Sequence, residues 1–282
     1  MKGTFLEKAF VAVVVAICVL PLLSILVLSV TNGSSQHPWL LNGFNWDNYV
    51  ALSNFSEAHD ALLSSLLLGI PVALVTSVAA FLFALCWWIG LSRKWLLIVL
   101  FAAACIPADI HALSLVAVYK MLGGTHGAWW LIALSMVTFC LPFATTIVVA
   151  SLSLVPKRLF EAASDLGGSS LITIWRVILP LVYPSVLSAA LISVLLCLNE
   201  FGRTFYLSGG SEYLSEFLKG RFEAGLDPRA YSLAAVMVLA GALLWAFVLF
   251  AWQLTASKSG TRQRKTDSTR SSEITRVPPA LD

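Results

Sequence analysis

The stretch LVPKRLFEAASDLGGSSLITIWRVILP, residues 154–180, separates two long apolar runs and decides how the rest of the chain is interpreted. Pro156 ends the apolar run before it, and the residues that follow predict a short helix. The pair Gly167-Gly168 stops this helix, because glycine readily adopts the left-handed conformation found after a helix end. Ser169-Ser170 are suited to cap a second helix, whose far end is expected near Pro180. The stretch therefore predicts a helix-turn-helix.

The first of these two helices has an apolar face at helical spacing. The residues able to share that face are Leu159, Phe160, Ala163 and Leu166. Glu161 stands near the helix start, where negative charge is favoured, and the neighbouring alanines permit a close approach of another backbone. A short helix of this kind is suited to insertion into a groove of another protein.

Long apolar runs lie on both sides of the stretch. The chain is 59% hydrophobic and 12% charged, with a mean hydropathy of +0.85, whereas a soluble domain carries about 25% charged residues. Each bilayer crossing needs about 20 apolar residues, and six such runs recur. They span residues 9–31, 60–89, 95–121, 129–153, 182–207 and 231–256. We therefore expect an all-α, polytopic membrane protein with six transmembrane helices over residues 9–256.

The charges predict the orientation of these crossings. The first external stretch, residues 31–60, contains no basic residue, and basic residues are enriched in cytoplasmic loops. With a cytoplasmic N-terminus, the segments on the inner side hold Lys2, Lys8, Arg93, Lys94, Lys157, Arg158, Arg176, Lys258, Arg262, Arg264, Lys265, Arg270 and Arg276, thirteen of the 18 basic residues. Both the N-terminal segment 1–8 and the polar tail 257–282 are thus predicted to be cytoplasmic. The tail has almost nothing to bury and is expected to be disordered and able to touch anionic lipid.

Two further features complete the membrane interpretation. The first apolar run is too long for the core of a signal peptide and lacks a small-residue cleavage site, so we expect a retained span. The external segment 208–230 mixes charged and aromatic residues and could form a short helix at the mouth of a pathway, or a plain solvated turn.

The loop resembles the signature of ABC importer permeases. Glu161-Ala162-Ala163, three residues, Gly167, nine residues, then Val177-x-Leu179-Pro180 is similar to the family's E-A-A-x(3)-G-x(9)-I-x-L-P pattern, with valine for isoleucine at one position. The resemblance implies a coupling loop, residues 154–181, that rests on an ATP-binding subunit. The residues expected to make this contact are Phe160, Glu161, Ala162, Ala163, Asp165, Leu166 and Gly167.

The resemblance extends over about residues 60–256 to the spermidine/putrescine permease branch of the family. Ile106-Pro107-Ala108-Asp109-Ile110 is similar to that branch's Ser-Pro-Asp-Ile stretch, and residues 138–143 to its Thr-Phe-Cys-Leu-Pro-Phe. The branch also includes carriers of other small solutes. A polyamine or a related amine-containing compound is therefore the expected cargo.

The family implies a type I importer permease (MetI-like) architecture, located in the bacterial inner membrane. Its implied partners are ATP-binding subunits, a second permease subunit and a periplasmic solute-binding protein, besides membrane lipid. No G-x-x-x-x-G-K-[ST] phosphate loop occurs, so ATP hydrolysis must reside in a partner. Neither a catalytic constellation nor a metal or cofactor site stands out, and nucleic acid is not an expected partner.

Ionisable residues within the apolar runs need an explanation, since each costs about 2.5–3.5 kcal/mol at the bilayer centre. Asp109 and Glu200 are predicted to line the substrate pathway and attract a cation. Alternatively, Glu200 pairs with Arg203 three residues later on the same helix face as a structural ion pair. The polyamine branch has paired acidic residues where this chain has Asn199-Glu200-Phe201-Gly202-Arg203. The added Arg203 also makes a substrate of both signs possible.

Two other classes of membrane protein fit the sequence less well. A secondary transporter often shows inverted repeats, and the two halves of this chain show no convincing repeat. A membrane-anchoring protein without transport leaves the coupling-loop pattern unexplained. Five cysteines, each inside an apolar run and without a C-x-x-C pair, are interpreted as small core residues.

Overall fold

The computed structural model describes residues 5–31, 43–44, 46–90, 94–124, 127–165, 167–210, 213–225, 229–243 and 246. The chain forms two units, residues 1–237 and 238–282. The described residues are almost entirely helical, apart from short turns and one isolated antiparallel bridge between Thr31 and Phe44. The expected all-α class is therefore found throughout the described residues.

The helices are, in chain order, α1 (Phe5–Ser29), α2 (Asp47–Ser53), α3 (Ser56–Ile89), α4 (Lys94–Ala104), α5 (Ala108–Met121), α6 (Trp129–Ser153), α7 (Arg158–Asp165), α8 (Ser170–Thr173), the π-helical turn η1 (Ile174–Ile178), α9 (Leu179–Asn199), α10 (Phe201–Leu207), α11 (Leu214–Gly225) and an apolar helix, Arg229–Leu243. Within the described residues, four helical stretches are long and apolar enough to cross a membrane: Glu7–Ser29, Ser56–Ile89, Trp129–Ser153 and Ser170–Asn199. The pair α4–α5 makes a fifth if it counts as one bent span.

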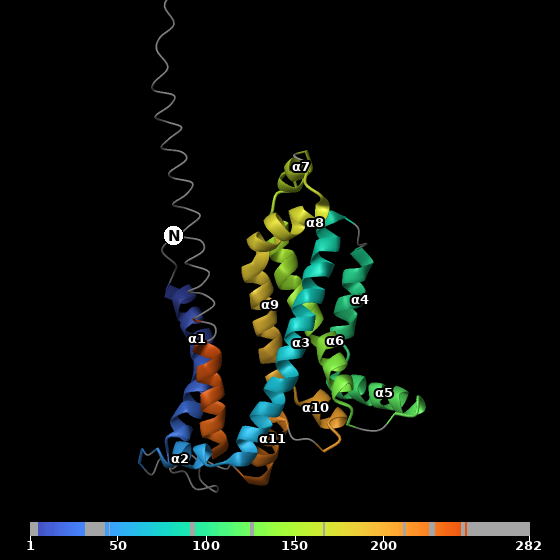
Figure 1. Ribbon diagram of the computed structural model, residues 1–282. Coiled ribbons are helices and arrows are strands. Elements are labelled where there is room, and N and C mark those ends of the chain that lie inside the picture. The colour runs from blue at the N-terminus through green and yellow to red at the C-terminus, as the bar shows by residue number, and fades with distance from the viewer. Residues whose placement is uncertain are drawn as a thin grey trace, which may run out of the picture. The chain divides into compact units, whose positions relative to one another are not determined.

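The centre of the first unit is a bundle of α3, α6 and α9 (Figure 1). Small side chains lie where these helices meet, and Ala80 and Ala84 of α3, Ala144 of α6 and Ala189 of α9 are all fully buried. Small residues let membrane helices approach closely, which increases the van der Waals contact that holds them together in lipid. Other apolar side chains of α3 and α6, such as Leu67, Leu74 and Leu134, are exposed on the outside of the bundle.

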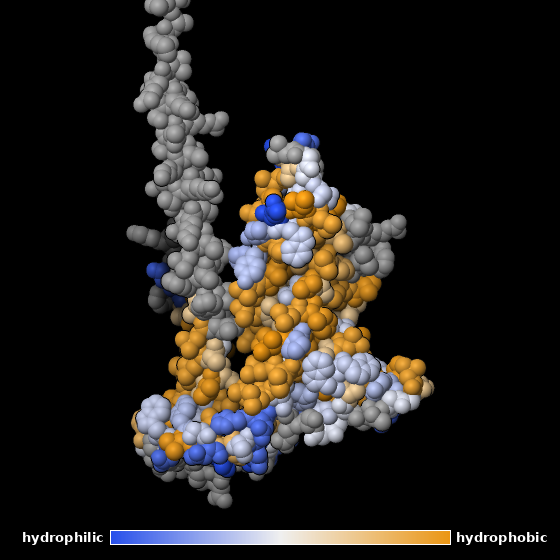
Figure 2. All heavy atoms as spheres, in the orientation of Figure 1, coloured by the Kyte–Doolittle hydropathy of each residue, from blue (hydrophilic) through white to orange (hydrophobic). Residues whose placement is uncertain are grey.

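The surface of this bundle is arranged for a bilayer. Apolar residues cover the middle of the visible face, and polar residues gather at its two ends (Figure 2). At one end lie α7 and α8, and at the other lie α2, α5, α10 and α11 (Figure 1). The predicted coupling loop and the predicted external segments therefore occupy opposite ends of the bundle.

The third predicted span is not one straight helix. Residues 95–121 were expected to form a single crossing, but α4 ends at Ala104 and α5 starts at Ala108, at an angle of 97°. Pro107 lacks a backbone N–H and disfavours helical geometry at the residue before it, which explains the break. The 11 residues of α4 extend only about 16 Å, about half of the hydrocarbon core.

The fifth predicted span and the second loop helix also need correction. The helix that begins at Ser170 does not end near Pro180 but continues to Asn199, a stretch of 30 residues. The π-helical turn η1 precedes Pro180, and the N–H of Leu179 donates to the carbonyl of Ile174, five residues back. This wide turn accommodates the missing proline N–H without ending the helix. The break comes instead at Glu200, within the predicted span 182–207.

The other predicted runs appear as helices. α6 has the predicted bounds 129–153, and α1 and α3 contain most of the runs 9–31 and 60–89. The sixth run, 231–256, is described as a helix as far as Leu243, while its remainder and the tail 257–282 lie largely outside the described residues.

The cysteines are only partly the core residues that were predicted. Cys140 and Cys197 are buried, with their sulfur atoms 3.9 Å apart between α6 and α9. Cys18 and Cys86 are exposed on α1 and α3, and Cys105 is exposed in the turn after α4. An apolar run in a membrane protein has a lipid-facing side as well as a buried side, and the sequence alone does not separate them.

Candidate coupling loop and intramembrane polar site

The loop helix α7 ends as its glycines predict. Gly167 has a φ of +79°, in the left-handed region, and the N–H of Gly168 donates to the carbonyl of Ala163 at 3.0 Å. This bond, running back over five residues, is the hydrogen bond of a Schellman helix end. The chain therefore reverses sharply into α8.

One face of α7 rests on the bundle. The ring of Phe160 is partly buried and packs edge-to-face on Trp88 of α3, with the ring centroids 6.1 Å apart. Ala163 is also partly buried. Leu159, predicted to share this face, is 42% exposed, and Leu166 lies outside the described residues. The apolar contact between α7 and the bundle is thus narrower than the sequence predicted.

The opposite face of α7 is exposed. Glu161, Ala162 and Asp165 are exposed on it. The exposed side chains of α8 and η1 include Leu171 and Trp175, at 69% and 65%. This end of the bundle therefore presents an acidic helix face together with exposed apolar side chains.

The predicted side-chain cap of α8 does not form. Ser169 is the residue before the helix, but its side chain makes no capping hydrogen bond. Instead, the hydroxyl of Thr173 donates to the carbonyl of Ser169 at 3.2 Å. The position of the helix start was predicted correctly, and the hydrogen bond that was expected there is absent.

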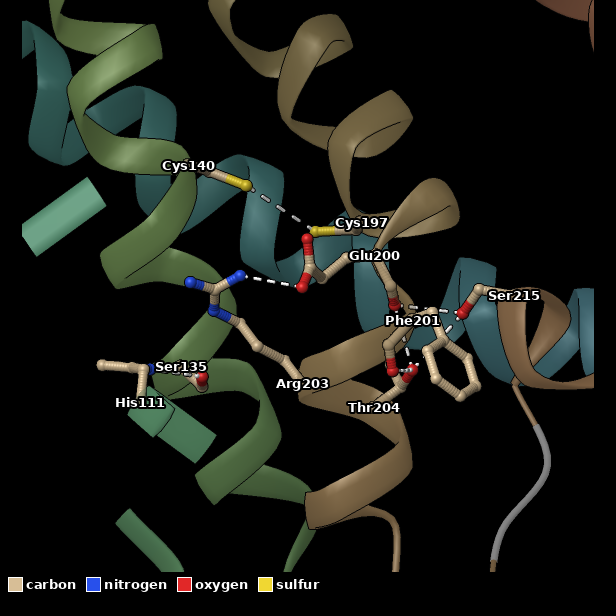
Figure 3. Close-up of polar contacts among 9 residues, drawn as sticks. All are labelled: His111, Ser135, Cys140, Cys197, Glu200, Phe201, Arg203, Thr204 and Ser215. Carbon is tan, nitrogen blue, oxygen red and sulfur yellow. Dashed lines mark hydrogen bonds and ion pairs between the residues drawn. The ribbon is translucent and has the colours of Figure 1, made fainter. Parts of the chain in front are cut away.

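Near the other end of the bundle, Glu200 occupies the break between α9 and α10. Its backbone is extended, with φ −85° and ψ 106°. Its carbonyl accepts hydrogen bonds from the hydroxyl groups of Thr204, at 2.9 Å, and Ser215, at 3.0 Å (Figure 3). Glu200 is the residue before α10, and the two hydroxyl groups add side-chain hydrogen bonds to the carbonyl at the start of that helix.

The carboxylate of Glu200 pairs with Arg203. Nη1 of Arg203 lies 2.8 Å from Oε1 of Glu200, and the two side chains are 3% and 15% exposed (Figure 3). The guanidinium also lies over the ring of Phe139 on α6, 4.3 Å from its centroid. The structural pairing expected from the spacing is present, but Glu200 stands at a helix break and not on a shared helix face.

Asp109 lies against α10, the short helix that carries Arg203. It is in the first turn of α5, just after the break at Pro107, and its side chain is exposed. A Cβ placed on Gly202 of α10 would lie 2.5 Å from Oδ1 of Asp109, so a larger residue at position 202 would require this carboxylate to move. Asp109 and Glu200 therefore occupy two helix breaks that adjoin each other.

His111 lies on α5, two residues after Asp109. Its Nδ1 is 3.1 Å from the hydroxyl of Ser135, a buried residue of α6 (Figure 3). The contact ties α5 to the bundle and accounts for a polar residue at this position. His111 therefore has a structural partner within the described residues.

The sequence missed several residues of this site. Phe139 contacts the guanidinium of Arg203, Gly202 lies beside the carboxylate of Asp109, and Ser215 donates to the backbone carbonyl of Glu200. The type and spacing of these residues do not distinguish them in the sequence. Only the stretch 138–143, which carries the family resemblance, pointed to the neighbourhood of Phe139.

Comparisons with known proteins agree with this geometry. Residues 61–257 match the family model described as "Binding-protein-dependent transport system inner membrane component". The chain is 30% identical over 244 residues to the "Spermidine/putrescine transport system permease protein PotC" of Haemophilus influenzae, which covers 85% of this chain and 93% of that protein. It is 27% identical over 246 residues to the protein of the same name from Escherichia coli K12, with 85% and 90% covered.

Solved structures support the fold. A bacterial ABC transporter "involved in the import of the acidic polysaccharide alginate" contains a chain that matches with a TM-score of 0.62 and 16% identity, covering 88% of this chain and 94% of that one. Such low identity shows the fold alone. Permeases of the matched family are non-catalytic and work with an ATPase and a periplasmic binding protein. This chain belongs to that family of binding-protein-dependent inner-membrane components, as a multi-pass permease subunit of an ABC importer.

Proposed function

We propose that this permease forms half of the translocation pathway for a small amine-containing solute, with polyamines as the expected class. The observation that supports the cargo most is the pair of acidic residues, Asp109 and Glu200, at two adjoining helix breaks in an otherwise apolar bundle. Acidic groups at membrane depth mark ion and substrate pathways, because burying them without such a role is costly. The relatives at 27–30% identity are named as spermidine/putrescine permeases, which supports the same class of cargo.

In this proposal, the loop 154–181 couples the pathway to the ATP-binding subunit. The residues that make the contact are Phe160, Glu161, Ala162, Ala163, Asp165, Leu166 and Gly167. The packing of Phe160 on Trp88 supports this role, because it joins α7 to a long helix of the bundle. A loop without such a contact would absorb a displacement instead of passing it on.

The proposed arrangement has six crossings with both termini in the cytoplasm and the type I importer architecture. The bent pair α4–α5 forms the third crossing, and the helix Arg229–Leu243 is the described part of the sixth. A second permease subunit completes the pathway. The opposite placement of α7 and α11 on the bundle is consistent with this orientation (Figure 1).

A second candidate cargo is a solute that carries both charges. Arg203 favours it, because a buried guanidinium beside Glu200 offers a partner for an anionic group as well. The two candidates differ in what neutralising Arg203 does: a solute that carries an anionic group loses a partner, whereas a purely cationic solute does not.

The test is uptake into proteoliposomes that contain the complete transporter with its cognate binding protein. We expect import of labelled spermidine, and the variant Asp109→Asn should lower it by about tenfold, the effect of losing one charged hydrogen bond. The matched control is Glu223→Gln, which removes an exposed carboxylate of α11. If the binding protein instead co-purifies with a solute that has no amine, the proposed cargo is wrong.

A further inference from the structure

Arg203 occupies the kind of site that binds an amine. Ammonium and guanidinium groups are bound by a carboxylate together with an aromatic ring face. Glu200 supplies the carboxylate at 2.8 Å, and Phe139 supplies the ring at 4.3 Å. The guanidinium of Arg203 already contacts both groups. Figure 3 shows its pairing with Glu200.

The fit of Arg203 in this site is incomplete. Its side chain is 97% buried, as the 3% exposure implies, yet its Nε has no hydrogen-bond partner among the described residues. A buried donor without a partner destabilises the arrangement that contains it. A ligand whose donors are all satisfied could therefore compete with Arg203 for the carboxylate.

The backbone around the pair would permit such an exchange. Arg203 belongs to α10, a helix of seven residues that is separated from α9 by the break at Glu200. Glu200 itself is held through its carbonyl by Thr204 and Ser215, independently of its carboxylate. Release of the guanidinium therefore leaves the backbone hydrogen bonds of the break in place.

We propose that Arg203 is a built-in competitor, which fills the amine-binding site formed by Glu200 and Phe139 until a cationic solute displaces it. The inference rests on the proposed function. It identifies the substrate group as a primary ammonium and assigns the carboxylate and the ring as its partners. While the site is empty of solute, Arg203 neutralises Glu200, and the apolar bundle contains no unpaired carboxylate at this position.

The experiment compares ligand binding by wild type and by Arg203→Gln in the purified transporter without its binding protein. The measured quantity is the concentration of 1,4-diaminobutane that gives half of the maximal rise in the thermal unfolding midpoint at a fixed scan rate. In Arg203→Gln this concentration should fall by roughly three- to tenfold. This ratio corresponds to the free energy of one cation–aromatic contact, which the competing guanidinium no longer makes. The neutral analogue 1,4-butanediol should give no rise.

Three further variants separate this role from a purely structural one. Arg203→Lys retains a competing cation and should resemble wild type. The double variant Glu200→Gln/Arg203→Gln lacks the carboxylate and should show no rise. Arg221→Gln is the matched control, because Arg221 of α11 also contacts a carboxylate and an aromatic ring. Its partners are Glu57 of α3 and Phe55, and this ion pair is exposed. Arg221→Gln should resemble wild type.

An unchanged half-saturating concentration in Arg203→Gln, or an equal response to the diol, overturns the inference. If Arg203→Gln assembles poorly, its yield from cells supplied with the diamine or the diol gives the same comparison, and rescue by neither compound also overturns it. Failure of the proposed function is distinguishable: wild type would then import no cationic solute in the uptake assay, whatever the diamine does to the variant. If wild type imports the cationic solute but the half-saturating concentration is unchanged in Arg203→Gln, the role of Arg203 as a competitor is wrong and the proposed function stands.

Discussion

Gly202 lies directly against the carboxylate of Asp109, and this contact is sensitive to a single methyl group. The Cβ of Gly202→Ala would lie 2.5 Å from Oδ1 of Asp109 and 3.0 Å from Cβ of Ala108. We expect the variant to lose about 1–3 kcal/mol through overpacking, measured as a lower unfolding midpoint of the purified transporter.

Gly220 of α11 provides the matched control, because a Cβ there meets nothing within 4 Å. Gly220→Ala should be neutral or stabilise by about 0.5–1 kcal/mol, since alanine favours helices over glycine. Removing the carboxylate as well, in Gly202→Ala/Asp109→Ala, should recover part of the loss. Equal midpoints for Gly202→Ala and Gly220→Ala would show that Asp109 does not lie where we describe it.

Gly167 is constrained by its backbone and not by its neighbours. Its φ is +79°, and a Cβ would meet open space. Gly167→Val should therefore distort the end of α7 at a cost of about 1–2 kcal/mol and lower the uptake supported by each ATP hydrolysed, whereas Gly167→Asn should be tolerated, because asparagine adopts the left-handed conformation. Equal uptake per ATP in both variants contradicts a role for this helix end in coupling.

The residues of the polar site could be predicted from the sequence only where their type is unusual. Asp109, Glu200 and Arg203 stand out because charged residues are rare in apolar helices. Phe139 and Gly202 do not stand out, because their importance depends on which helix faces meet. Side-chain contacts between distant helices follow from packing, which the periodicity of one helix does not specify.

At the scale of helices, the contact between Phe160 and Trp88 holds α7 on the bundle. Phe160→Ala removes the edge-to-face contact and the partly buried ring. We expect amide hydrogen exchange in residues 158–165 to accelerate by about tenfold, which corresponds to about 1.4 kcal/mol lost from local stability. Leu154→Ala, at an exposed position at the start of the loop, should leave the exchange rate unchanged. No acceleration in Phe160→Ala would mean that other contacts hold α7.

Hydropathy located the helices better than it located their interruptions. It predicted α6 with its bounds, because a long apolar run between polar segments has one simple interpretation. It missed the breaks at Pro107 and Glu200, because an apolar run does not report whether the backbone inside it is continuous. Pro107 was a visible signal for the first break, whereas the second break has no proline of its own.

The whole molecule offers a direct test of the proposed orientation. Lys157, beside α7, and Glu223, on α11, are both exposed at opposite ends of the bundle. In a background without the native cysteines, Glu223→Cys should react with a membrane-impermeant maleimide in right-side-out vesicles, and Lys157→Cys only in inside-out vesicles. The reverse labelling pattern would contradict cytoplasmic termini.

Fold class and family could be predicted from the sequence at this scale, since they depend on composition and on one motif. Apolar runs of bilayer length exclude a soluble protein, and Glu161-Ala162-Ala163 with Gly167 identifies the permease family. The cargo could not be predicted in this way, because it depends on a few side chains and on partner proteins whose sequences are separate.

The uninterrupted helix from Ser170 to Asn199 has a mechanical consequence. Its 30 residues correspond to about 45 Å of helix, so one continuous helical segment joins the end of the bundle that carries α7 to the residue just before Glu200. The π-helical turn η1 and Pro184 are the positions at which this helix would bend most readily. In the proposed arrangement, a movement of the ATP-binding subunit at Ser170 and the position of the Glu200 carboxylate are therefore linked through a single helix.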